Sequence, residues 1–296
     1  MRSIFAFVRL TRPLFLYGGF AGVALGAAVA AWTGRRLDAA TYLWAQALVT
    51  AFHLMVHYAN DYFDRDGDAG ARRTAWSGGS GVLAGGELPP RVALAAALVC
   101  GGLGVVACAR FALAGNGAVV AAGLSILALA WCYSAPPVRF AARGLGELDA
   151  ALVVAVLVPV VGYAAFTGRL DDPILTAVIA PAGAMFAMML CVELPDAGTD
   201  LAAGKRNLVV RFGPARAWEL IVAAACFAVL TAVATALKVH AGPAMLALAP
   251  ATVTALVLVR RVKGDPRPAA VAFGGVALYA ATVTGQAALY ALLALR

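Results

Sequence analysis

Residues 42–68, with the sequence YLWAQALVTAFHLMVHYANDYFDRDGD, join an apolar run to a cluster of carboxylates. The apolar part, 42–59, has roughly the length that a membrane helix needs. The carboxylates that follow it are Asp61, Asp64, Asp66 and Asp68. Three of them, Asp61, Asp64 and Asp68, share one face of a continuing helix, whereas Asp66 points elsewhere. Like charges this close destabilise one another unless a cation lies between them. Because the side chains offer only oxygen ligands, the pattern predicts a Mg²⁺ site at the mouth of a membrane helix.

The composition extends this membrane assignment to the whole chain. Of 296 residues, 63% are hydrophobic and 13% charged, and the mean hydropathy is +0.87. These values are too apolar for a soluble domain. We predict an all-α, polytopic membrane protein with nine transmembrane helices in one bundle, forming a single domain over residues 1–296. The predicted helices are 14–33, 41–59, 91–112, 115–133, 148–167, 173–193, 215–236, 242–261 and 268–294.

Lysine and arginine predict the orientation of these helices. Of the 23 Lys and Arg residues, 17 fall at the N-terminus or after the second, fourth, sixth or eighth helix. Because Lys and Arg favour the cytoplasmic side, we expect the N-terminus in the cytoplasm and the C-terminus outside. The expected location is a bacterial cytoplasmic membrane. The net charge of +8 then reflects topology and affinity for anionic headgroups or an anionic substrate, and nucleic acid is not expected as a partner.

The acidic residues lie on the same side, and they include a second cluster. Twelve of the 15 are predicted on the cytoplasmic side, a bias that the rule for positive residues does not explain. Asp196 and Asp200, spaced i, i+4, follow the sixth predicted helix just as the first cluster follows the second. A cation follows each cluster, Arg72 after the first and Lys205 after the second. This pattern predicts a four-helix pseudo-repeat, helices 1–4 and 5–8.

Other polar residues are predicted near the same helix ends. Tyr133 and Ser134 end the fourth helix, and Arg139 and Arg143 follow in the loop. His57 lies one turn before the first cluster, where we expect it to line a cavity near a substrate, whereas His53, a turn deeper, is expected to pack in the core. The five cysteines lie in or beside apolar stretches without metal-binding spacing, so we interpret them as packing residues.

Two carboxylate sets facing each other across a helical bundle suit one class of chemistry. They can hold Mg²⁺ ions which, with nearby Arg and Lys, stabilise a diphosphate as it leaves. The apolar interior of the bundle would hold an isoprenoid tail and shield an allylic cation from water.

The motifs also resemble those of a known family. Asn60-Asp61-x-x-Asp64-x-x-x-Asp68 and Asp196-x-x-x-Asp200 resemble the two aspartate motifs of UbiA-type intramembrane prenyltransferases. The resemblance continues through 133–147 and 204–213, and it implies a nine-helix bundle in which Mg²⁺ joins the aspartates to a polyprenyl diphosphate. Ionisation of that donor would give a carbocation that an aromatic acceptor attacks.

Three stretches look closest to the menaquinone branch of this family, whose acceptor is 1,4-dihydroxy-2-naphthoate: 61–64 (DYFD), 144–147 (GLGE) and 204–211 (GKRNLVVR). Two positions depart from the pattern. His57 replaces an expected Asn, and Glu193-Leu194-Pro195 replaces an Asn-rich lead-in to the second motif. Both departures bear on the acceptor pocket or the metal shell.

Chemistry and resemblance together predict roles for individual residues. The expected Mg²⁺ ligands, which are also expected to be catalytic residues, are Asp61, Asp64, Asp68, Asp196 and Asp200. Tyr133 is expected to stabilise the cation through its ring or to orient the diphosphate. The expected substrate-binding residues are Asn60, Arg72, Arg139, Arg143, Lys205, Arg206, His57 and Ser134.

Several alternatives remain open at this stage. The first cluster alone is also compatible with a solvated helix end. Within the family, the acceptor could instead be a heme, a chlorophyll precursor, another phenol or a sugar phosphate, or the enzyme could cyclise a terpene without an acceptor. A membrane transporter that binds cations is a different class, but transporters more often place ionisable groups near the bilayer midplane.

Overall fold

The computed structural model describes residues 2–67, 76, 78–264 and 267–296, so the predicted ligand Asp68 and the predicted phosphate contact Arg72 lie outside the described residues. The long helices are α2 (Tyr17–Trp32), α3 (Ala39–Asp64), α4 (Pro90–Leu113), α5 (Gly117–Ser134), α7 (Val158–Thr167), α9 (Ile179–Glu193), α11 (Leu208–Lys238), α12 (Ala249–Gly264) and α13 (Pro268–Ala294). The short helical segments are α1 (Arg2–Leu10), η1 (Pro13–Leu16), η3 (Phe140–Ala142), α6 (Gly146–Leu152), η4 (Val153–Leu157), α8 (Asp172–Ala177), η5 (Leu194–Asp196), α10 (Ala197–Ala202) and η6 (Gly242–Leu248).

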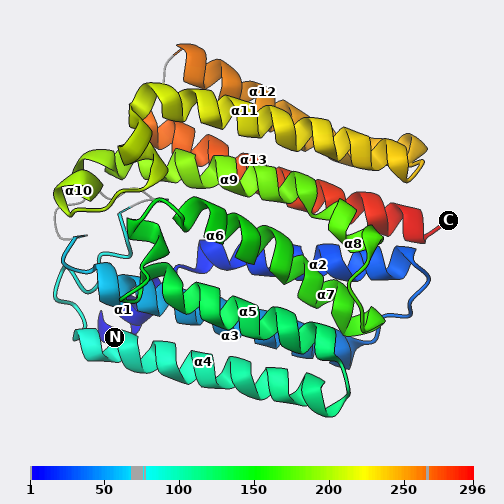
Figure 1. The fold of residues 1–296 in the computed structure, drawn as a ribbon, viewed down its shortest axis with the longest axis horizontal. Coiled ribbons are helices and arrows are strands. Elements are labelled where there is room, and N and C mark those ends of the chain that lie inside the picture. Colours follow the sequence, from blue (N-terminus) through cyan, green and yellow to red (C-terminus); the bar gives the residue numbers. More distant parts are fainter. Residues whose placement is uncertain (1, 68–75, 77, 265–266) are drawn as a thin grey trace.

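The predicted architecture is confirmed for the part of the chain that the structure describes. Nine helical stretches there are long and apolar enough to cross a membrane, one for each predicted helix. They run roughly parallel to one another, and the two chain ends lie at opposite ends of the bundle, as an odd number of crossings requires (Figure 1). Both acid clusters therefore fall at the same end, together with α1 and α10.

Three helices, α2, α9 and α13, lie at the centre of the bundle. α9 packs against both α11 and α13, and α2 packs against α7 and α13, while α3 packs on α4 at the other side. The α2–α7 contact is close because each helix has a glycine there. A methyl group at Gly26 would overlap the carbonyl oxygen of Pro159, and one at Gly162 would overlap the backbone of Val23. Small residues at such crossings let two helix backbones approach closely. The resulting van der Waals contacts hold helices together in lipid, where the hydrophobic effect does not drive their association.

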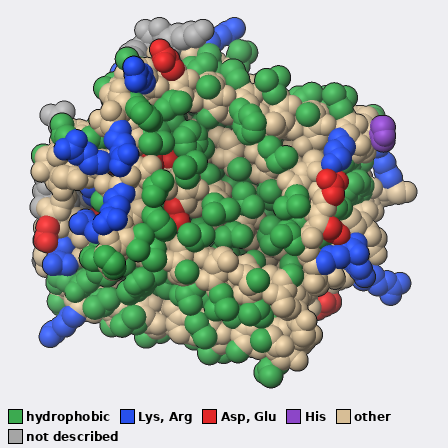
Figure 2. Space-filling view, in the orientation of Figure 1, with side chains coloured by type: hydrophobic (Ala, Val, Ile, Leu, Met, Phe, Trp, Pro, Cys, Tyr) green, Lys and Arg blue, Asp and Glu red, His purple; other side chains and the backbone are tan. Residues whose placement is uncertain are grey.

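The outer surface is apolar between two charged ends. Hydrophobic side chains cover a broad middle band, whereas Lys and Arg gather at the end that carries α10 and the N-terminus (Figure 2). Large side chains on the outer helices, such as Leu103 on α4 and Leu230 on α11, are exposed. An apolar surface of this extent marks contact with a membrane. The protein is an integral membrane protein.

Local breaks in the helices shape the end that carries the acid clusters. Asp38 caps the start of α3 by accepting a hydrogen bond from the Thr41 N–H (2.8 Å), and the helix continues past its apolar run to Asp64. α6 passes into the π-helical turn η4 before α7 begins. Gly213, at φ 77°, interrupts α11 before Pro214, which explains why the sequence places the start of that apolar helix at residue 215.

Candidate active site

A cavity of about 510 Å³ opens between the two acid clusters and extends into the apolar interior. One side of it comes from η1, α2 and α3, and the other from α5, α6 and α9, with α13 closing a third side. Its polar end contains Asn60, Asp64, Asp196, Asp200 and Lys205. The two clusters, far apart in the chain, thus line one space.

Lys205 connects the two clusters directly. Its Nζ atom lies 3.2 Å from Oδ2 of Asp64 and 3.5 Å from Oδ1 of Asp200. Asn207, which caps α11, donates a hydrogen bond from Nδ2 to the other oxygen of Asp200 (2.8 Å). A single cationic group therefore occupies the space between carboxylates of both clusters, where further positive charge would also be stabilised.

Asp61 faces a different set of partners. Its carboxylate, 3% exposed, forms an ion pair with Arg12 and accepts a hydrogen bond from the Ser80 hydroxyl. Arg12 has a left-handed backbone (φ 47°) just before Pro13, an uncommon conformation for a side chain of this size that often marks functional positions. Asp61 does not line the cavity itself, whereas Arg12 and Ser80 do.

Asn60 joins the first cluster to the end of α5. Its Nδ2 atom donates hydrogen bonds to Asp64 (2.9 Å) and to the Ser134 hydroxyl (2.8 Å). Ser134 is buried and does not line the cavity. Ser134 therefore positions Asn60 in this structure, whereas the sequence predicts that it contacts substrate.

The three arginines predicted to bind substrate within the described residues occupy different places. Arg139, at φ 50°, lies 3.7 Å from Asp64 and lines an outer pocket of about 530 Å³ that Asp64 and Lys205 also border. Arg143 is exposed and donates a hydrogen bond to the carbonyl of Pro137 (2.7 Å). Arg206 is also exposed. Neither Arg143 nor Arg206 lines the central cavity or the outer pocket.

Both histidines of α3 line the cavity wall. His57, as predicted, lines the cavity, and its Nδ1 lies 2.8 Å from the Thr11 carbonyl oxygen. His53 packs against Gly19 of α2, where an added Cβ would lie 2.9 Å from its Nδ1 atom, and it also lines the cavity. The two rings stack edge to face with centroids 4.8 Å apart, and Phe15 contacts His57 in the same way. These rings form a largely aromatic face beside the acid clusters.

Tyr133 and α6 form part of the opposite wall. The Tyr133 ring lies against Gly146, the first residue of α6, where an added Cβ would be 3.4 Å from the ring. Next to Gly146, the buried Glu147 accepts a hydrogen bond from the N–H of Leu208 (2.5 Å), which joins the starts of α6 and α11. Glu147 is therefore held within the scaffold, whereas Tyr133 faces the cavity.

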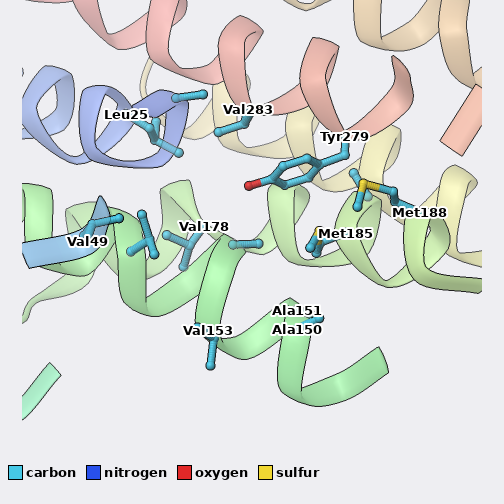
Figure 3. Packing of buried hydrophobic residues seen from close by; sticks show 14 of the residues in the cluster. Leu25, Val49, Ala150, Ala151, Val153, Val178, Met185, Met188, Tyr279 and Val283 are labelled. Carbon is cyan, nitrogen blue, oxygen red and sulfur yellow. The ribbon is translucent and has the colours of Figure 1, made fainter. Parts of the chain in front are cut away.

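The inner end of the cavity is apolar. The residues that line it include Met185 and Met188 of α9, Val153 of η4, Ala150 of α6 and Tyr279 of α13. Tyr279 lies beside the two methionines (Figure 3). Methionine adapts its shape to an irregular or variable apolar ligand. A chain of hydrocarbon suits this end, and a charged group suits the other.

The donor set at the polar end fits a hard cation such as Mg²⁺. It consists of carboxylate and amide oxygens, which Mg²⁺ prefers. Asp196, on η5, and Asp200, on α10, face the cavity together with Asp64 and Asn60. Among the described residues, no three His, Cys, Asp or Glu side chains already converge on one point. Mg²⁺ commonly completes its shell with water and substrate phosphate, so this arrangement does not require a closed protein cage.

Three residues with clear contacts at the site were not predicted to act there from the sequence. From the sequence, Arg12 is compatible either with a topological anchor or with a residue that faces the site, and Ser80 belongs to a glycine-rich loop that is either flexible or an anion-binding nest. Asn207 has an ordinary helix-capping pattern. Their partners, Asp61 and Asp200, are supplied by tertiary packing.

An all-helical membrane bundle with paired carboxylates and cations at the mouth of an apolar cavity defines an intramembrane enzyme of diphosphate chemistry. The UbiA prenyltransferase family model matches residues 20–281. This chain therefore belongs to the UbiA prenyltransferase family, and it is a prenyltransferase. The 1,4-dihydroxy-2-naphthoate octaprenyltransferase of Mycobacterium tuberculosis is 33% identical over 222 residues, which are 73% of each chain. Its namesake from Mycobacterium leprae is 32% identical over 247 residues, covering 79% of this chain and 80% of that protein.

Solved structures agree with this fold. A UbiA homologue from Archaeoglobus fulgidus, bound to GPP and Mg²⁺, has a TM-score of 0.70 at 19% identity and covers 96% of this chain and 99% of its own. The apo structure of a UbiA homologue from Aeropyrum pernix has a TM-score of 0.72 at 16% identity, over 91% of this chain and 96% of its own. At these identities the likeness concerns the fold.

Proposed function

We propose that this protein transfers a polyprenyl group from its diphosphate to an aromatic acceptor, with 1,4-dihydroxy-2-naphthoate as the first candidate, in quinone biosynthesis. The observation that carries the proposal is the convergence of both acid clusters on Lys205 above an apolar cavity. The names of the two mycobacterial relatives support the choice of acceptor.

We propose that Mg²⁺ is held by Asp64, Asp196 and Asp200, with Asn60 as a neutral oxygen donor. Asp61, which is paired with Arg12 in this structure, and Asp68 belong to the same predicted ligand set. Bound Mg²⁺ would neutralise the diphosphate and make it a better leaving group.

The protein's own residues would then act in turn. Lys205 and Arg139 bind the diphosphate oxygens at the mouth, since both already lie within ion-pair distance of Asp64. When the carbon–oxygen bond breaks, its electron pair leaves with the diphosphate and an allylic cation remains. The ring of Tyr133 offers a negative π face to that cation. The methionines and valines of the inner cavity exclude water, which would otherwise trap the cation. The aromatic acceptor attacks it to form the new carbon–carbon bond, and the attacked ring carbon then regains aromaticity by losing its proton to the released diphosphate.

The proposed setting is a bacterial cytoplasmic membrane with the site on the cytoplasmic side. The distribution of Lys and Arg supports this orientation, because the end that carries the acid clusters is also the end where these residues gather (Figure 2). The tail of the donor would remain among apolar side chains while its diphosphate reaches the charged mouth.

The test is a transfer assay with purified full-length protein in lipid nanodiscs. Radiolabelled polyprenyl diphosphates of several lengths are incubated with Mg²⁺ and a panel of dihydroxynaphthoate, hydroxybenzoate and other phenolic acceptors. We expect Mg²⁺-dependent prenylation of the dihydroxynaphthoate and loss of product when EDTA is added. Product with a different acceptor alone would overturn the choice of acceptor. No product with any donor and acceptor would overturn the proposal as a whole.

A further inference from the structure

Two carboxyl groups that line the cavity, Asp149 and Glu193, have no assigned role in the metal site, and each has a buried oxygen without a hydrogen-bond partner among the described residues. Asp149, on the first turn of α6, is the more deeply buried of the two, 7% exposed, and it lines the cavity with Ala150 and Val153. Its neighbour Glu147 on the same helix is bound to the N–H of Leu208. Asp149 differs because its side chain has no hydrogen-bond or ion-pair partner among the described residues, and its Oδ1 atom is fully enclosed.

A buried carboxyl group without a partner is destabilising, because it has lost its hydrogen bonds to water and gained none from the protein. The cost is avoided if a ligand supplies the missing hydrogen bond. The cavity-lining residues that follow Asp149 along α6 and η4 are Ala150, Val153 and Val154, all of them apolar. The Asp149 carboxylate is therefore placed to accept a hydrogen bond from one polar atom of a ligand that is otherwise mostly apolar.

The chemistry of a carboxylate limits which class of ligand can bind next to Asp149. An isoprenoid tail has no hydrogen-bond donor, so it would leave Asp149 unpaired. A diphosphate is an anion, which a carboxylate repels. A hydroxyl group on an aromatic ring donates a hydrogen bond and brings an apolar body that suits the apolar cavity wall. On 1,4-dihydroxy-2-naphthoate the 4-hydroxyl meets this requirement, because it lies away from the carboxylate of the ring.

A second unpartnered polar group borders the same cavity. Tyr279, on α13, is 4% exposed, and its hydroxyl has no hydrogen-bond partner among the described residues. It lies over Gly18 of α2, where an added Cβ would be 3.7 Å from the hydroxyl oxygen. α6 and α13 both pack against α9, and Met185 of α9 faces the space between them (Figure 3). A flat ring that carries one polar atom on each of two edges could meet Asp149 on α6 with one of them and Tyr279 on α13 with the other.

We propose that Asp149 accepts a hydrogen bond from one hydroxyl of the aromatic acceptor while Tyr279 pairs with a second oxygen on the same ring, so that the two residues select a dihydroxy-aromatic acceptor. This inference rests on the proposed function for the identity of the substrate, but it assigns a binding role to two residues outside the aspartate motifs. The proposal depends mainly on Asp149, and Tyr279 adds the requirement that the ring has a second oxygen substituent.

The test measures equilibrium binding, without donor, to full-length protein in nanodiscs. The ligands are 1,4-dihydroxy-2-naphthoate and its two mono-methyl ethers, each of which lacks one donor hydrogen. The variants are Asp149→Leu, Asp149→Asn and Tyr279→Phe. Glu147→Gln and Thr282→Val serve as matched controls. The Glu147 control is buried on α6 but bound within the scaffold. Thr282 is buried on α13, with its hydroxyl bonded to the Leu278 carbonyl.

We expect Asp149→Leu to weaken binding of the diol about tenfold or more. The ether that blocks the hydroxyl facing Asp149 should bind the wild-type protein comparably weakly, and Asp149→Leu should not weaken it further. Asp149→Asn, which keeps a carbonyl acceptor, should restore part of the affinity. Tyr279→Phe should give a smaller loss that follows the other ether, and both controls should bind as the wild type does.

Three outcomes would overturn the inference: no binding of the diol to the wild-type protein, equal wild-type affinity for the diol and both ethers, or an equal loss for diol and ethers in Asp149→Leu. If that variant does not fold, the wild-type comparison of diol and ethers and the Asp149→Asn variant decide the matter. A wild-type protein that binds the diol selectively but forms no prenylated product would overturn the proposed function and leave the binding inference standing.

Discussion

In the first acid cluster, Asp61 and Asp64 lie in the last turn of the 26-residue helix α3. The second cluster lies beyond the end of α9, with Asp196 on a short 3-10 turn and Asp200 on the six-residue helix α10. Asp61 and Asp64 are 3% and 5% exposed, and Asp61 is enclosed by Arg12 and Ser80. Asp200 is more open and is oriented by Asn207.

This difference shows that two motifs with similar spacing have unequal surroundings. In the first cluster, a rigid helix and protein cations hold the carboxylates. In the second, short segments carry them, and the partners of the Asp200 side chain among the described residues are Lys205 and Asn207. The first cluster is therefore the more firmly held of the two, and the second depends more on its few side-chain contacts.

The largest effect is expected for Asp64, where the two clusters meet. Asp64→Ala removes a carboxylate that faces Lys205, Arg139 and the cavity. We expect turnover to fall about 10³-fold, as when a main electrostatic group of an active site is lost. Asp66→Ala is the matched control, because its side chain is 87% exposed and points off the shared face. Initial rates at saturating donor measure both, and equal losses would contradict the helical phase that separates them.

A smaller loss is expected at the second cluster. Asp200→Ala should lower turnover about 10²-fold, because Asp196 and the first cluster remain. Asp172→Ala, in an exposed ion pair with Lys238 at the far end of the bundle, should leave turnover within about twofold of wild type, since such pairs contribute little. The assay is run over a Mg²⁺ titration. A Mg²⁺ midpoint that does not rise in Asp200→Ala would argue against its role as a ligand.

The enclosure of Asp61 predicts a further effect. Arg12→Gln leaves a buried carboxylate without its cation, and we expect turnover to fall roughly 10- to 100-fold, as for residues that orient ligands. Arg110→Gln, at the end of α4, is the control and should behave as wild type. Single-turnover rates separate this effect from product release. If Arg12→Gln retained full activity, the ion pair with Asp61 would be structural only.

The smallest effect is expected where only orientation changes. Asn207→Ser keeps an oxygen that can cap α11 but is too short to reach Asp200, so the melting temperature should stay near wild type while turnover falls about tenfold. Asn116→Ser is the matched control, because Asn116 caps α5 at the opposite end of the bundle. A change in melting temperature as large as the change in turnover would assign Asn207 to the scaffold alone.

Much of the fold was predictable because it depends on local properties. A run of about 20 apolar residues predicts a membrane helix without knowledge of its neighbours. Helix parity then places residues 61–68 and 196–200 at the same end of the bundle. The kink at Gly213 was also readable, because Gly-Pro interrupts a helix wherever it occurs. The pseudo-repeat and the assignment of the cytoplasmic side remain predictions.

The surroundings of individual side chains were less predictable. Arg143 and Arg206 are of the residue type that commonly binds phosphate, yet both are exposed and neither faces the cavity. His53 and Asp149 lie in apolar stretches, yet both line it. Periodicity shows which residues share a helix face but not which neighbouring helix covers that face.

The sequence by itself determined the class of protein, the nine spans and the two carboxylate motifs, because hydropathy and helical spacing act over a few turns. Only the tertiary structure decided that Lys205 joins the two clusters, that Arg12 encloses Asp61, and that Asp149 faces the cavity without a partner. Those contacts join residues from separate helices and loops. They depend on how closely the helices approach, as at Gly26 and Gly162, and such distances arise only when the whole bundle is packed.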